Sequence, residues 1–253
     1  MRHLIFKVLV VAVAFGLGEH ALSVEPVQKP STESMTVAQL EAAGDLARSQ
    51  KDYAEAIKFF DAALRKEPKN AVLYNKLGLA ELKTDDLTAA RIDFQKAAKH
   101  NSKYSDAINN LGAISYLQKN YGAAAKQFKK AVALNETRAV FHVNLGAAWF
   151  GQKKLERAIA EYARALELDP DALTNSANAG IAAQIASPEE RAKYQYMLAK
   201  IYAKRGNTEE CLRCLKIAKE QGYKDMQNVY KDEEFTNVRK DSRLTEIVPP
   251  PAK

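Results

Sequence analysis

Two cysteines are the side chains in this 253-residue chain that are best placed to do chemistry together. Cys211 and Cys214 form a Cys-x-x-Cys pair close to the expected start of a helix, where thiol pKa values are lowered. In an oxidising compartment such a pair could form a disulfide and support a thiol-redox function. The alternative is that Cys211 is a small buried residue of a helix. Two thiols without further ligands do not make a metal site.

The other reactive side chains form no recognisable catalytic arrangement. The four histidines are scattered along the chain, and there is no Ser-His-Asp order, phosphate-binding glycine loop or metal-ligand cluster. We therefore expect a protein that is not an enzyme and needs no cofactor or metal. The formal charge of +7 comes from lysines spread along helices rather than from an arginine-rich run, so we expect no nucleic-acid partner.

The first 23 residues have the pattern of a secretory signal peptide. Arg2 and Lys7 flank the start of an apolar run over residues 8–18, and small residues at Ala21 and Ser23 favour cleavage after Ser23. This run is shorter than the roughly 20 residues that span a bilayer. An uncleaved anchor remains the alternative. We expect no membrane span after cleavage, a mature protein outside the cytoplasm, and a flexible leader over residues 24–35.

A 34-residue period dominates the rest of the chain. A column of glycines recurs at this interval, together with two columns of alanines and one of aromatic residues. All four columns repeat every 34 residues over five units. Such a period indicates a repeat array, in which each unit buries its apolar face against its neighbours. The glycine column is Gly44, Gly78, Gly112, Gly146 and Gly180.

Each unit is predicted to be a helical hairpin, with residues 37–70 as the template. Thr36 and Gln39 form a capping box before the first helix, Asp52 caps the second, and Pro68 ends it. Small residues at Gly44 and Ala56 should let the two helices approach closely. The aromatic column, represented by Phe60, should fill the space between one hairpin and the next.

These columns resemble the tetratricopeptide repeat, whose Leu-Gly pair occurs here at 77–78, 111–112 and 145–146 and whose late proline occurs at Pro68 and Pro170. The resemblance implies an all-α fold, a right-handed superhelical solenoid of antiparallel helix pairs. It has about five to six repeats and a C-terminal helical cap. The array covers residues 37–206, with units at 37–70, 71–104, 105–138, 139–172 and 173–206.

The chain beyond the fourth unit can be interpreted in two ways. Ser187 caps a helix over about 188–205, which either closes unit five through Tyr196 or opens a sixth unit through Tyr202. We predict a fifth hairpin with a long second helix, then a last helix from about 208 to 221. The last helix and cap occupy residues 207–248, and 249–253 form a tail. The cap is similar to closing segments of bacterial members of the family, which implies a periplasmic or cell-envelope location.

The resemblance also implies a concave groove lined by the first helices, in which another protein or peptide binds. Phe150, Tyr116 and Leu82 are the expected anchors for an extended peptide or an amphipathic helix. The carboxylate clamp of the chaperone-tail-binding members is absent, because unit one has Glu41 and Asp45 in its place. A structural module with weak self-association is a further alternative. The full predicted groove is Glu41, Asp45, Arg48, Asn75, Leu79, Leu82, Asp106, Asn109, Tyr116, Val140, Val143, Phe150 and Ile181.

Overall fold

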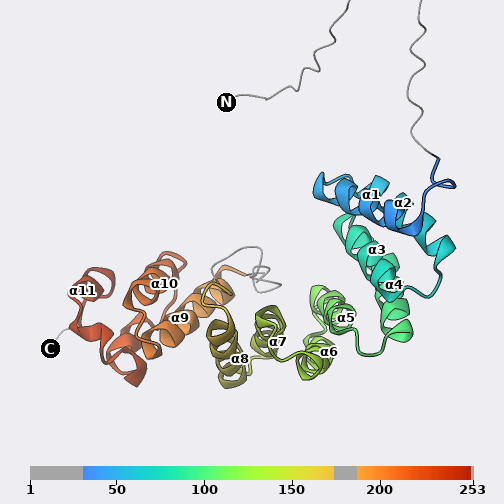
Figure 1. Cartoon of the computed structure of the whole chain (residues 1–253). Helices are drawn as coiled ribbons and strands as arrows, with labels where there is room; N and C mark the ends of the chain where they lie inside the picture. The colour runs from blue at the N-terminus through green and yellow to red at the C-terminus, as the bar shows by residue number, and fades with distance from the viewer. Residues whose placement is uncertain (1–30, 174–186, 252–253) are drawn as a thin grey trace, which may run out of the picture.

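Helices form all the regular structure in the described part of the chain, residues 31–173 and 187–251 of a computed structural model. Consecutive helices pack as antiparallel pairs, and the pairs follow one another in an elongated, bent array (Figure 1). The expected all-α solenoid is therefore confirmed. The first four pairs consist of α1 (Val37–Ser49) and α2 (Tyr53–Lys66), α3 (Ala71–Lys83) and α4 (Leu87–His100), α5 (Ser105–Leu117) and α6 (Tyr121–Leu134), and α7 (Ala139–Gly151) and α8 (Leu155–Leu168).

The helices begin and end where local chemistry requires it. Thr36 accepts a hydrogen bond from the Gln39 amide while the Gln39 side chain accepts one from the Thr36 amide, so the expected capping box is present. Asp52 caps α2 by accepting from the Glu55 amide. In each of the four hairpins, the residue just before the second helix's cap has a left-handed φ of 60–64° and turns the chain back; these residues are Lys51, Asp85, Lys119 and Lys153.

The glycine column makes room for an aromatic ring of the same hairpin. A Cβ atom built at Gly44 would lie 2.5 Å from Cε1 of Phe60, which is closer than any van der Waals contact. The expectation that the aromatic column only fills space between hairpins is therefore corrected. Phe94 does both, because it packs against Gly78 within its own hairpin and shares a buried cluster with Ile114 of the next one.

The helix α9 (Pro188–Lys204) pairs with α10 (Thr208–Glu220) in the same way as the helices of the earlier hairpins. Gly206 has a φ of 75° and Asn207 caps α10, which reproduces the turn of the earlier units. The Asn207 amide donates to the Tyr202 carbonyl at 2.9 Å, just as Asn120 donates to Ser115. Thus α9 opens a hairpin with α10. The expected first helix of unit five, with Gly180 and Ile181, falls in 174–186, outside the described residues.

The segment after α10 packs on α9 and closes that end of the apolar core. It consists of the short helices η2 (Met226–Tyr230), η3 (Glu233–Phe235), η4 (Val238–Lys240) and α11 (Arg243–Ile247). Phe235 is fully buried with its ring centroid 5.6 Å from that of Tyr196. Leu244 is also fully buried. The segment therefore covers apolar surface as a solenoid cap does.

Candidate partner-binding surface

A ladder of polar contacts joins the first helices of neighbouring units. The Lys76 Nζ atom lies 2.7 Å from Glu41 Oε1 and also contacts Asp45, so α3 is tied to α1. The next steps are made by amides: Asn110 donates to Asn75 at 2.9 Å, and Asn144 donates to Asn109 at 2.9 Å. In every step, the sixth position of one unit contacts the fifth position of the unit before it.

Asn75 and Asn109, two of the predicted groove residues, join neighbouring helices in this ladder. Both are buried, and a buried amide without a partner would cost about 1–3 kcal/mol. Their side-chain oxygens are occupied by the next helix, which fixes the register of α3, α5 and α7. In the sequence, the two residues of each such contact are 35 positions apart. A comparison at the 34-residue period does not align them, so the pairing is not seen there.

Most of the predicted groove residues on α1 and α3 are partly exposed. Glu41, Asp45 and Arg48 are each partly exposed, and Arg48 pairs with Asp45 at 3.1 Å. Leu79 and Leu82 on α3 are half-buried and pack against the cluster around Phe94. The surface of α1 and α3 therefore combines apolar side chains with a compact group of opposite charges, which includes Lys76. Farther along, the groove residue Asp106 pairs with Arg138 at 2.9 Å.

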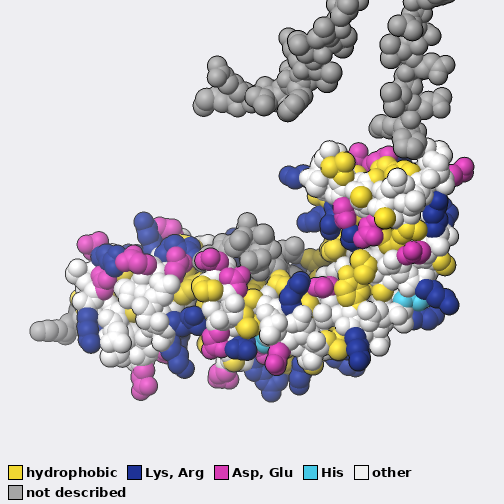
Figure 2. Space-filling view, in the orientation of Figure 1, with side chains coloured by type: hydrophobic (Ala, Val, Ile, Leu, Met, Phe, Trp, Pro, Cys, Tyr) yellow, Lys and Arg dark blue, Asp and Glu magenta, His cyan; other side chains and the backbone are white. Residues whose placement is uncertain are grey.

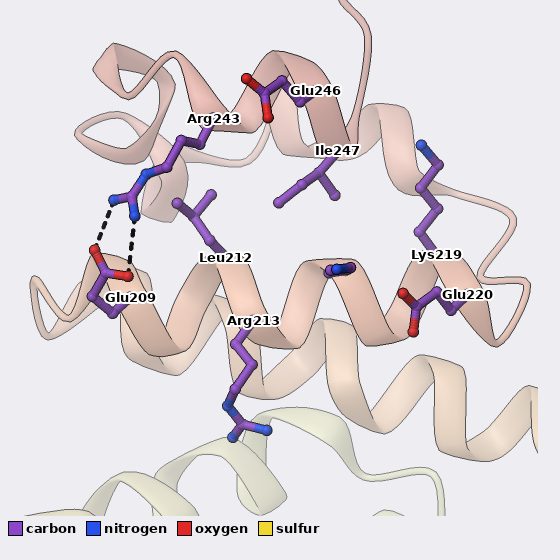
Figure 3. A pocket seen from close by; sticks show the side chains of 9 residues that line it. Glu209, Leu212, Arg213, Lys219, Glu220, Arg243, Glu246 and Ile247 are labelled. Atoms are coloured by element: carbon purple, nitrogen blue, oxygen red, sulfur yellow. Dashed lines mark hydrogen bonds and ion pairs between the residues drawn. The ribbon is translucent and has the colours of Figure 1, made fainter.

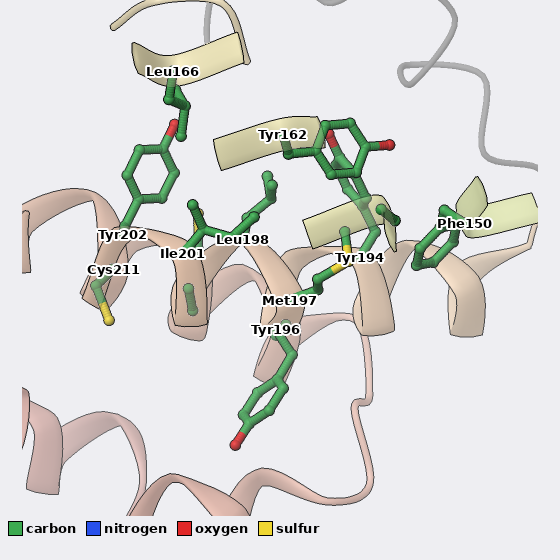
Figure 4. Packing of buried hydrophobic residues seen from close by; sticks show 14 of the residues in the cluster. Phe150, Tyr162, Leu166, Tyr194, Tyr196, Met197, Leu198, Ile201, Tyr202 and Cys211 are labelled. Carbon is green, nitrogen blue, oxygen red and sulfur yellow. The ribbon is translucent and has the colours of Figure 1, made fainter. Parts of the chain in front are cut away.

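The predicted apolar part of the groove is closed. Phe150 is only 8% exposed, and its ring packs edge-on against Tyr194 of α9 with centroids 5.7 Å apart (Figure 4). Tyr116 is 7% exposed against Tyr121, and Val143 is fully buried. The expected exposure of these three groove residues is corrected, because their side chains belong to the core, and with it the anchor role expected for Phe150 and Tyr116. Val140 is half-buried, and Ile181 is not among the described residues.

The two cysteines are buried and carry free thiols. Burial raises the pKa of Cys211 and of Cys214 to about 12, so the expected lowering near a helix start does not occur. Cys211 occupies the core-facing position that alanine fills in the second helices of the earlier hairpins. This agrees with the alternative that Cys211 is a small buried residue of a helix. This environment does not favour a thiol-redox function.

The sequence did not predict the environments of two ionisable groups, the buried His142 and the half-buried Glu81. His142 lies between the Glu161 carboxylate, 2.7 Å from Nδ1, and the Glu136 carbonyl, 3.0 Å from Nε2. Glu81 on α3 faces Asp93 on α4, and burial together with that negative charge raises the pKa of Glu81 to about 8. The sequence signal for both was weak, because each partner is on the other helix of the hairpin.

The largest cavity described lies at the other end of the molecule, between α10 and α11 (Figure 3). It has a volume of about 710 Å³, with Leu212 and Ile247 as its apolar residues. At one end Arg243 makes paired hydrogen bonds with Glu209, at 2.7 and 3.1 Å. Its remaining lining mixes basic and acidic side chains, so charge does not select one kind of ligand.

Within residues 31–173 and 187–251, no three His, Cys, Asp or Glu side chains are grouped to hold a metal ion. In the same part of the chain, no helix has both the length and the hydropathy needed to cross a bilayer.

Comparisons with known proteins agree on the architecture. Models of the tetratricopeptide repeat match residues 41–106, 75–139 and 139–172, which together exceed half of the chain. No curated protein matches it.

Three similar solved structures come from different organisms. PilF of Pseudomonas aeruginosa is 17% identical with a TM-score of 0.55, over 84% of this chain and 92% of that one. TTC0263, a tetratricopeptide protein of Thermus thermophilus, is 19% identical with a TM-score of 0.52, over 78% of this chain and 97% of that one. MamA of Desulfovibrio magneticus is 19% identical with a TM-score of 0.52, over 73% of this chain and 94% of that one. At such identities the likeness concerns the fold alone.

Proposed function

The chain belongs to the tetratricopeptide repeat family, and from this membership we propose that it is a non-catalytic scaffold binding an extended peptide or amphipathic helix on its first-helix face. The family's repeats serve as protein-interaction scaffolds. We define the first-helix face as the surface of α1, α3, α5 and α7 on which the polar ladder lies.

The ladder is the observation that carries this proposal. Its hydrogen bonds hold α1, α3, α5 and α7 in one register before any partner arrives. A surface that is already ordered loses less conformational entropy on binding than a flexible one. A peptide laid across these helices would therefore meet side chains in fixed positions.

The contact region is the N-terminal part of this face. Leu79 and Leu82 on α3 offer apolar surface, and Glu41, Asp45 and Arg48 on the neighbouring α1 offer charges. Protein-binding surfaces typically combine apolar and polar contacts in this way. Leu82 remains from the three expected anchors, whereas Tyr116 and Phe150 contribute to the packing that supports the surface.

Site-specific photo-crosslinking tests this proposal. A photoreactive amino acid in place of Leu82 should capture a protein from cell-envelope extract, whereas the same group in place of Ile92 should not. Ile92 is a matched control, since it is an apolar residue of the same hairpin and is 47% exposed on the second helix. Asp45→Lys should weaken the capture at Leu82. Equal capture at both positions would argue against a dedicated first-helix face.

We further propose that the mature protein acts outside the cytoplasm, in a bacterial cell envelope. The basic residues and apolar run of residues 1–23 support this location. Mass spectrometry of the protein recovered from a periplasmic fraction should give Val24 as the first residue. Recovery of an intact N-terminus from the cytoplasm would contradict it.

Weak self-association is the remaining partner hypothesis. Sedimentation velocity over a range of concentrations tests it directly. A single concentration-independent species would restrict the partners to other proteins.

A further inference from the structure

A second cleft lies on the opposite helices of the array, between α6 and α8. It has a volume of about 360 Å³, and α7 contributes Leu145 and Trp149 to its lining. Val132 of α6 extends this apolar part, while Lys129 of α6 and Arg157 of α8 lie on its two sides. We call this site the α6–α8 cleft. Its α7 residues Leu145 and Trp149 are not among the ladder or contact residues of the first-helix face proposed above.

The helix α6 contributes only positive charge beside the α6–α8 cleft. Lys126, Lys129 and Lys130 are the only charged residues of α6, and none of them contacts a carboxylate of a described residue. Figure 2 shows Lys and Arg side chains, with Asp and Glu among them, along the lower edge of the array, where Figure 1 places α6. The three lysines of α6 attract anions and repel cations.

Trp149 connects the apolar and the basic parts of the cleft. The Arg157 guanidinium and the Lys154 ammonium each lie 5.0 Å from the centroid of its ring. These cation–π contacts hold two cations beside an apolar wall. The one carboxylate in the lining, Glu161, is engaged by His142 at 2.7 Å. Among the described residues, Glu161 forms no ion pair with Lys129 or Arg157, and both cations are exposed.

We propose that the α6–α8 cleft binds an acidic peptide segment of a partner protein, with an aliphatic side chain of that segment inserted between Val132 and Trp149. The carboxylates of the segment would contact Lys129 and Arg157. The first-helix face and this cleft would then give the scaffold two separate docking surfaces.

The chemistry of the cleft favours a peptide over a nucleic acid. A phosphate backbone needs cations alone, whereas the apolar lining of Val132, Leu145 and Trp149 gains free energy only when apolar surface is buried. A segment with alternating carboxylates and aliphatic side chains satisfies both parts.

Trp149 is the only tryptophan of the chain, so its fluorescence reports binding at this cleft without a label. The probe is the blocked peptide Glu-Glu-Leu-Leu-Glu-Glu, titrated into the full-length protein. We expect a saturable change in emission. The peptides Lys-Lys-Leu-Leu-Lys-Lys and Glu-Glu-Gly-Gly-Glu-Glu should give at least about tenfold weaker binding, because each lacks one of the two complementary features.

Two variants test whether the acidic peptide binds at the α6–α8 cleft. The double variant Lys129→Gln, Arg157→Gln should weaken binding of the acidic peptide by about tenfold, while its unfolding midpoint stays close to that of the wild type. Lys69→Gln is the matched control, since Lys69 is an exposed lysine without an ion pair in the turn between α2 and α3. Binding by Lys69→Gln should equal that of the wild type.

Three results would overturn the inference. The first is no change in emission up to about 1 mM peptide, the weak end of specific recognition. The second is equal binding of the glycine-containing peptide, which would show that the cleft attracts any anion. The third is tighter binding of a short oligothymidylate, which would assign the cleft to nucleic acid.

Discussion

Gly112 of α5 lies directly against the ring of Phe128 in α6. A Cβ atom at Gly112 would be 2.6 Å from both Cδ1 and Cε1 of that ring. Gly146 has the same relation to the ring of Tyr162, at 2.9 Å from Cε1. Each of the first four hairpins is thus closed by an aromatic ring that packs on a glycine, and this contact explains why both columns keep the same period.

Gly112→Ala should destabilise the protein by about 1–3 kcal/mol, because the added methyl group forces the Phe128 ring out of its position. Gly122→Ala is the matched control in the same hairpin. A Cβ atom at Gly122 meets only the Asn120 side chain, at 3.9 Å. This control should range from neutral to a gain of about 1 kcal/mol from helix propensity. Urea unfolding of both variants measures the difference, and similar midpoints would contradict the predicted clash.

Phe94→Ala should cost about 3–5 kcal/mol, since a fully buried ring is removed from the contact between two hairpins. Ile92→Ala in the same helix should change stability by less than about 0.5 kcal/mol, because Ile92 is largely exposed. Hydrogen exchange should show the loss of protection first in α3, α4 and α5. A uniform loss over the whole array would argue against coupling between nearest neighbours only.

The contact between His142 and Glu161 should make stability depend on pH. The hydrogen bond to Glu161 raises the pKa of His142 above its usual value, and the Glu136 carbonyl adds to this effect. The charged pair therefore stabilises the fold fully below the unfolded pKa of about 6.5, and the contribution is lost as pH rises through the folded pKa. Each pKa unit between the folded and the unfolded value changes the free energy of unfolding by about 1.4 kcal/mol.

Glu161→Gln tests this pH dependence. The stability of the wild type should exceed that of the variant most at about pH 6, and the difference should shrink toward pH 9. Urea titrations at several pH values measure it. A difference that is independent of pH would show that Glu161 acts by packing alone.

Glu81→Gln should increase stability at alkaline pH. Burial and the charges of Asp93 and Asp61 raise the pKa of Glu81 from 4.5 to about 8. The protonated carboxyl is compatible with the fold below the unfolded pKa, and this advantage is lost as pH rises through the folded pKa. We expect a gain of about 1–2 kcal/mol at pH 9, limited by solvent screening, and little change at pH 5. Equal effects at both pH values would contradict it.

The cysteines should be unreactive in the folded protein. With pKa values of about 12, roughly one thiol in ten thousand is ionised at pH 8. A thiol-specific disulfide reagent should react with both cysteines only after unfolding in urea. Rapid modification of the native protein would revive the thiol-redox hypothesis. Replacement of both cysteines by alanine should leave partner capture at Leu82 unchanged.

Local rules made much of the fold predictable. The capping box at Thr36 and the cap at Asp52 depend on residues three positions apart, which the sequence shows directly. The helix pairs follow from the period, because one unit repeats the same local pattern. The predictions failed where the partner was distant: the sequence placed Phe150 in an open groove, but Tyr194 of α9 covers it.

By itself, therefore, the sequence determined the repeat, the positions of the first four hairpins and the family, since these rest on spacings along the chain, whereas the pairing of α9 with α10 needed the structure. Only the tertiary structure decided which side chains stay accessible. It placed Phe150, Tyr116 and Val143 in the core, committed Asn75 and Asn109 to neighbouring helices, and left the α6–α8 cleft exposed. The physical reason is that burial depends on contacts between units, and these are set by how each hairpin stacks on the next.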